Sequence, residues 1–199
     1  MTSAPVVSHA LATRVAHAGL ASAVVVDLLT GIIEQPPTPS YPENVFYAVH
    51  LISGWCALVL ALAFWAIILV RRIGTDPGLL MPWFNRRRLR AFVLDLKAQM
   101  ASLLANRLPP YQKASPLAGA LHGLGLLLIS ATAASGLIYE IAQGTGGAEN
   151  HLLPLAKDLH DALGGMVWVY LLGHGLMSLI RHYGLDKSLR EMWSFGHHD

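Results

Sequence analysis

Two histidines, His160 and His174, lie fourteen residues apart in the otherwise apolar stretch "LHDALGGMVWVYLLGHGLMSLIRHY", residues 159–183. Fourteen residues make just under four helical turns, so both imidazoles share one helix face, about 21 Å apart along its axis. Ionisable side chains are costly at membrane depth and are usually functional there. If this segment crosses a bilayer, it presents one imidazole toward each side.

Two more histidines match this pair in depth along their own apolar segments. His50 corresponds to His160 near the outer side, and His17 corresponds to His174 near the cytoplasmic side. The pattern predicts two bis-histidine sites stacked across the bilayer, with all four histidines as ligands to iron. Haem is the expected occupant because axial imidazoles hold haem iron, and helix bundles hold cofactors between facing helices.

Glycines follow two of these histidines at the same spacing. "HLISG" ends at Gly54 and "HDALG" ends at Gly164, so each reads HxxxG. A residue without a side chain lets a flat porphyrin lie close to the backbone. Helix–helix packing in membranes also favours small residues and explains these glycines as well.

A fifth histidine, His122, belongs to a faint internal repeat. The stretches from His17 to Gly31 and from His122 to Gly136 share a His-to-Gly spacing of fourteen, as in a duplicated helical hairpin. Three interpretations remain open. His122 replaces His17 as the partner of His174, lines a quinone pocket, or forms a hydrogen bond between helices.

The bulk composition indicates the elements that must position these histidines. Only 13% of the 199 residues are charged and the mean hydropathy is +0.47, against about 25% charge in soluble domains. Apolar runs of ~20 residues predict transmembrane helices. We expect an all-α, four-helix membrane bundle forming a single domain over residues 1–199. The expected spans are roughly 13–33, 45–70, 115–141 and 159–180.

Basic residues are unevenly distributed among the loops. The first loop has no Lys or Arg and the third has only Lys157, whereas the second loop and the C-terminal tail are basic. The positive-inside rule therefore predicts that both termini are cytoplasmic. Residues 83–108 of the second loop have apolar positions at helical spacing. They predict an amphipathic helix on the cytoplasmic surface, serving as a connector or as a docking face.

A single cysteine, Cys56, excludes a disulfide framework, and a net charge of +2 gives no indication of nucleic-acid binding. Asp27 lies inside the first span, as part of a proton path or as a hydrogen-bonded interior residue. Lys157 pairs with an outer haem propionate, attracts an anion such as superoxide, or simply ends a helix.

The four spans, and above all the fourth with the following "DKSLREMW", resemble the bacterial dihaem cytochrome b561 family. That group includes the b-type cytochrome subunits of nickel-iron hydrogenases and the gamma subunits of formate dehydrogenases. The resemblance covers residues 13–193 and implies a multi-pass protein of the bacterial inner membrane with two haem b groups. His50 and His160 would bind the outer haem, and His17 and His174 the inner one.

The resemblance implies electron transfer between a periplasmic-side redox partner and the quinone pool, as the membrane subunit of a redox complex. The chain is also similar to superoxide:ubiquinone oxidoreductase, so a stand-alone superoxide:quinone oxidoreductase is the alternative. A third interpretation is a membrane anchor in which the haems mainly hold the bundle together.

The second loop resembles the dehydrogenase-type subunits in "PWF" and "PPYQK", where the region before the third helix helps to bind quinone. Candidate quinone contacts are Tyr111, Gln112, Lys113 and His122. An interface aromatic and a positive-inside anchor explain Tyr111 and Lys113 equally well. Three arginines at the cytoplasmic surface could bind haem propionates by charge-assisted hydrogen bonds, or act only as topology determinants: Arg14, Arg72 and Arg181.

Overall fold

The computed structural model describes residues 10–38, 40–70, 76–105, 107, 115–146 and 152–183. Within these ranges the secondary structure is helical, with short connections and no β-strand. Four of the described helices are long and apolar enough to cross a membrane. They are α1 (Leu11–Thr30), α2 (Val45–Val70), α5 (Pro116–Gly146) and α6 (Leu152–Arg181). The prediction of an all-α, multi-pass membrane bundle is confirmed.

The span boundaries differ from the sequence prediction except at α2. Helix α6 begins at Leu152 rather than at 159, and α5 continues to Gly146 rather than 141. Hydropathy marks only the apolar part of a helix, whereas these helices continue into polar sequence at the membrane surface. Helix α1 begins at Leu11 and ends at Thr30, before the expected 33, because residues 31–33 form a turn.

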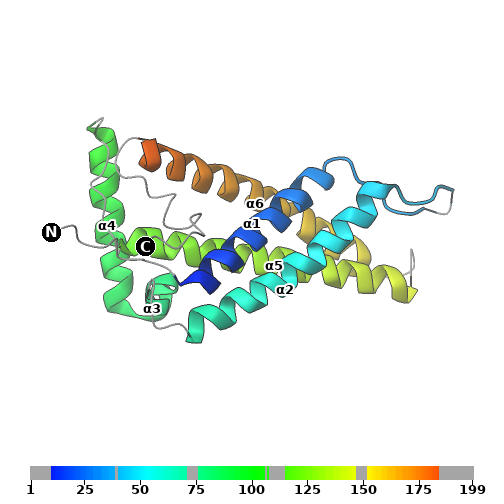
Figure 1. The fold of residues 1–199 in the computed structure, drawn as a ribbon, viewed down its shortest axis with the longest axis horizontal. Coiled ribbons are helices and arrows are strands. Elements are labelled where there is room, and N and C mark those ends of the chain that lie inside the picture. The colour runs from blue at the N-terminus through cyan, green and yellow to red at the C-terminus, as the bar shows by residue number, and fades with distance from the viewer. Residues whose placement is uncertain are drawn as a thin grey trace.

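The spans form two hairpins. Helix α1 packs along α2, α5 packs along α6, and α2 joins the hairpins by packing against α5 (Figure 1). Ala57 and Ala61 of α2 are buried in the shared core, where small side chains let helices approach closely. Two hydrogen bonds link α2 to α5: Trp65 Nε1 donates to Ser130 Oγ over 3.1 Å, and Tyr47 Oη donates to Gln143 Oε1 over 3.0 Å.

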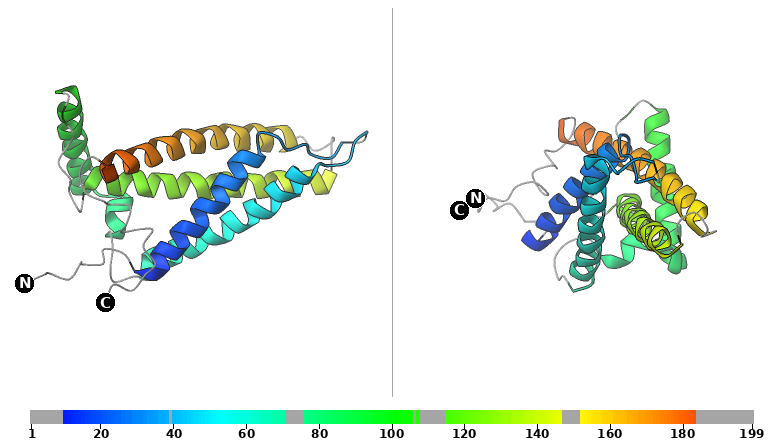
Figure 2. Two further views of the ribbon diagram at one scale, coloured as in Figure 1. Left: turned by 45° about the horizontal axis from the view of Figure 1, so that its top comes forward. Right: turned by 90° about the vertical axis from the view of Figure 1, so that its right-hand side faces the viewer.

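The connection between the hairpins holds three helical elements: α3 (Pro77–Leu80), a 3-10 helix (Pro82–Phe84) and the longer α4 (Arg86–Leu104). The predicted surface segment 83–108 therefore contains a helix, but the helix begins only at Arg86. Asn85 caps it, since its Oδ1 accepts from the backbone N–H groups of Arg87 and Arg88. Helix α4 lies across the end of the bundle at which α1 and α5 begin (Figure 2). Its four arginines lie at the end that the positive-inside rule predicts to be cytoplasmic.

Helix α4 turns a polar face toward α5. The buried Asp95 carboxylate accepts from Ser115 Oγ over 2.6 Å, from the Leu117 N–H over 3.0 Å and from Gln99 Nε2 over 3.1 Å. A carboxylate is stabilised there by the free N–H groups at the start of α5. An apolar stripe on α4 remains exposed, as suits a helix in the membrane interface. It consists of Leu89, Val93, Leu96, Met100 and Leu103.

Candidate functional site

The outer pair consists of His50 on α2 and His160 on α6. Their ring centres are 6.1 Å apart and their planes are inclined by 88°. A metal–imidazole bond is about 2 Å long and the ring centre lies about 1 Å behind the nitrogen, so two imidazoles on opposite sides of one metal have centres about 6 Å apart. Any angle between the ring planes is compatible with this arrangement, because both planes contain the metal–nitrogen axis.

Each outer imidazole is held through its Nδ1 atom. His160 Nδ1 lies 3.0 Å from the Thr132 carbonyl oxygen and 3.0 Å from Ser135 Oγ. His50 Nδ1 lies 3.0 Å from the Asp27 carbonyl oxygen and 3.2 Å from Thr30 Oγ1. A carbonyl oxygen only accepts, so Nδ1 carries the proton on both rings. Nε2 then keeps its lone pair for a metal, as is usual for histidine ligands.

The two outer pockets repeat one local motif. A carbonyl group is followed by a hydroxyl three residues later and by a glycine after that: Asp27, Thr30 and Gly31 in α1 and its end, and Thr132, Ser135 and Gly136 in α5. A Cβ at Gly31 would lie 3.4 Å from His50 Cε1, and one at Gly136 would lie 3.0 Å from His160 Cε1. Gly136 therefore gives the His160 imidazole room against α5, whereas a Cβ at Gly31 would only touch His50 at ordinary contact distance.

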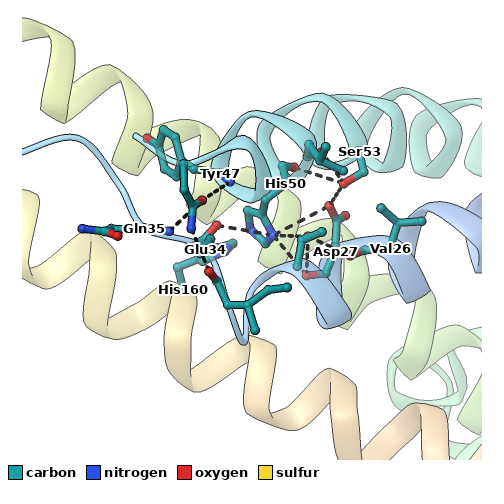
Figure 3. Close-up of polar contacts among 12 residues, drawn as sticks. Val26, Asp27, Glu34, Gln35, Tyr47, His50, Ser53 and His160 are labelled. Carbon is teal, nitrogen blue, oxygen red and sulfur yellow. Dashed lines mark hydrogen bonds and ion pairs between the residues drawn. The ribbon is translucent and has the colours of Figure 1, made fainter. Parts of the chain in front are cut away.

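Two carboxyl groups stand beside His50. Its Nδ1 is 4.0 Å from Asp27 Oδ1 and 3.7 Å from Glu34 Oε2, and Ser53 Oγ donates to Asp27 Oδ1 (Figure 3). Asp27 is thus a hydrogen-bonded interior residue, and its part in a proton path stays a prediction. Burial raises the pKa of the Glu34 carboxyl, although His50 and Lys157 act in the opposite direction.

The inner pair consists of His17 on α1 and His174 on α6, with ring centres 6.4 Å apart. His122 on α5 is closer to His174, at 5.4 Å, and its ring is nearly perpendicular, at 77°. Tyr170 stacks on His174 at 5.5 Å. The distance between the His17 and His174 rings suits a metal bound between two imidazoles. His122 and Tyr170 lie closer and pack against the His174 ring itself.

Tyr170 can stack on His174 because α5 has a glycine, Gly125, where the Tyr170 ring packs against it. A Cβ at Gly125 would overlap the Tyr170 ring at Cζ, so only glycine permits this packing. Tyr170, Thr30, Thr132 and Ser135 were not among the residues that sequence reasoning selected. A Ser-Gly or Thr-Gly step ends both of the repeated His-to-Gly stretches and was the available signal for two of them.

The residues of both pairs fit a haem. Gly164 lies one turn after His160. Apart from the local helix backbone, no described atom lies within 4 Å of a Cβ built there. The same holds for Gly173 and Gly175 beside His174. No cluster of three or more His, Cys, Asp or Glu side chains suited to a bare metal ion occurs in the described part of the chain. Two imidazoles beside open backbone suit a metal whose other ligands come from a flat macrocycle.

The remaining candidates fall in different places. Arg14 lies on α1 one turn before His17. Arg72, Tyr111, Gln112 and Lys113 lie outside the described residues, as does the side chain of Arg181 at the end of α6. Lys157 pairs with Asp161, one turn further along α6, so its charge is locally balanced.

Four apolar spans form a bundle with two histidine pairs, and α6 contributes one histidine to each pair. This is the architecture of a membrane-bound b-type cytochrome. A sequence model of the prokaryotic cytochrome b561 family matches residues 8–195, and the chain belongs to that family. It is therefore a membrane protein that binds haem b and transfers electrons. No curated protein and no solved structure matches the chain. The resemblance noted from the sequence is confirmed at the level of the family.

Proposed function

We propose that this protein binds two haem b groups and carries electrons across the bacterial cytoplasmic membrane, between a redox partner on the outer side and quinone on the cytoplasmic side. The observation that supports this most is the presence of two histidine pairs, with ring centres 6.1 Å and 6.4 Å apart, whose α6 members are fourteen residues apart. A continuous helix separates these members by about 21 Å along its axis, which carries the pathway through most of a bilayer core about 30 Å thick.

His50 and His160 would hold the outer haem, and His17 and His174 the inner one. When bound, haem supplies reversible one-electron oxidation and reduction. The chain itself fixes the imidazoles: backbone carbonyls and hydroxyls orient both outer rings through Nδ1. The apolar helices exclude water from both sites. Arg14 is the described arginine proposed for an inner propionate, and Arg72 and Arg181 are proposed with it.

Quinone would bind at the cytoplasmic end, beside the inner pair. His122 supports this location because it is exposed on α5 while its ring lies 5.4 Å from His174. A histidine there can donate or accept the protons that quinone exchanges on reduction and oxidation. Tyr111, Gln112 and Lys113 precede α5 in the chain and remain proposed contacts.

The redox partner would be a periplasmic or membrane-attached protein subunit. With one cysteine and no nucleotide-binding glycine loop in its sequence, the chain needs another source of electrons. A stand-alone superoxide:quinone oxidoreductase is the alternative outcome. Superoxide-dependent quinone reduction by the isolated protein would favour it, whereas a stable redox subunit that co-purifies would favour the complex.

The first experiment is a dithionite-reduced minus oxidised visible spectrum, with haem counted per chain, on the wild type and on His160→Ala. His182→Ala, at the position directly after the end of α6, serves as the matched control. We expect two haems in the wild type and in the control, and at most one in His160→Ala. A wild type with one haem or none, or an unchanged count in His160→Ala, would refute the two-site assignment.

A further inference from the structure

The two outer ligands occupy equivalent pockets that differ in charge. Asp27, Thr30 and Gly31 around His50 correspond to Thr132, Ser135 and Gly136 around His160, each 105 positions further along the chain. Both pockets offer Nδ1 a carbonyl oxygen at 3.0 Å and a hydroxyl nearby. A carboxyl group at position 27 stands where the other pocket has the Thr132 side chain.

The two carboxyl groups beside His50 are largely shielded from solvent. The side chains of Asp27 and Glu34 are 18% and 27% exposed. Ser53 donates to the Asp27 carboxyl from the next turn of α2, and Glu34 Oε2 lies 3.7 Å from His50 Nδ1. Partial burial weakens screening, so these charges act on the imidazole more strongly than surface carboxylates would.

We propose that Asp27 and Glu34 are positioning residues that lower the reduction potential of the outer haem. This inference rests on the proposed ligation by His50. A carboxylate beside Nδ1–H makes the imidazole a more basic ligand. The oxidised iron carries one more positive charge than the reduced iron, so nearby negative charge stabilises the oxidised state.

This asymmetry orders the potentials of the two haems. His174, the ligand of α6 at the inner site, packs against the neutral ring of Tyr170 and against His122. The outer haem would then have the lower potential, and electrons would move favourably from the outer side toward the cytoplasmic side.

The test is an equilibrium redox titration of the purified haem-loaded protein, followed by visible absorption, on the wild type and Asp27→Asn. Asparagine keeps the shape and the oxygen that accepts from Ser53, but removes the charge. We expect the equilibrium constant for reduction of the outer haem to rise about tenfold, which is 59 mV for one electron, while the inner haem is unchanged. The component lost in His50→Ala identifies the outer haem.

Two further variants separate a charge effect from a structural one. Glu34→Gln should shift the same component in the same direction, and Glu43→Gln, an exposed carboxyl at the same end of the bundle, should leave it unchanged. If Asp27→Asn loses haem, the potential of the outer haem in Glu34→Gln tests the inference instead. Two haems with unshifted potentials would overturn this inference alone, whereas a wild type without two haems would overturn the proposed function.

Discussion

Replacing Gly136 with alanine should weaken haem binding at the outer site without unfolding the protein. The new Cβ would lie 3.0 Å from His160 Cε1 and 3.3 Å from Nδ1, closer than ordinary contact. The imidazole must turn away from α5, which costs about 1 kcal/mol as an off-rotamer side chain. It also weakens the Nδ1–H bond to Thr132, worth about 1 kcal/mol. About 2 kcal/mol corresponds to roughly 30-fold weaker haem binding.

The matched control is Gly144→Ala, on the same helix, where no described atom outside the local helix backbone lies within 4 Å of the new Cβ. Both substitutions improve helix propensity by about 1 kcal/mol, so the comparison isolates the contact with His160. The assay is haem titration of the haem-depleted protein, read from the visible spectrum, together with thermal unfolding in detergent. Equal haem affinity in the two variants would refute the reasoning that α5 packs against a ligand.

Three other changes test separate parts of the structure. Gly164→Leu should lower outer haem content at least tenfold, since its side chain would enter the space beside His160, whereas Gly165→Leu points about 100° away and should not; equal haem contents would place the porphyrin elsewhere. His122→Ala should keep two haems but slow quinone reduction about 100-fold in a stopped-flow assay, and loss of a haem would assign it as a ligand instead. Asp95→Asn should lower the free energy of unfolding by about 1–3 kcal/mol, because it weakens the link from α4 to α5; an unchanged thermal midpoint would contradict this.

The sequence predicted the four spans because each carries a long, mainly apolar run, and it predicted the family from the four spans, above all the fourth. It misjudged helix ends, since hydropathy does not report how far α6 continues beyond the apolar region, back to Leu152. It indicated the metal-binding candidates because histidine is rare in membranes. It did not indicate the groups that hold them: Thr132 acts through its carbonyl oxygen, which every residue type has.

The internal repeat explains why the inner site differs from the outer one. His50 and His160 are 110 positions apart on the second helices of the two hairpins, and by the same offset His174 corresponds to Phe64. The structure preserves this relation: His17 meets Phe64 with ring centres 6.5 Å apart at 76°, and His122 meets His174 at 5.4 Å and 77°.

Each hairpin thus places a histidine of its first helix against an aromatic ring of its second helix at the cytoplasmic end. Only the second hairpin has an imidazole on its second helix here, because the first hairpin has Phe64 where the second has His174. At the outer end the second helices supply two equivalent ligands, but at the inner end they cannot. His174 must find its partner on a first helix, where His17 and His122 are the two candidates. His17 comes from the opposite hairpin, as His50 does for His160, so an inner site between His17 and His174 would bridge the two hairpins at both ends. His122, on the same hairpin as His174, is then available for another role at the cytoplasmic surface.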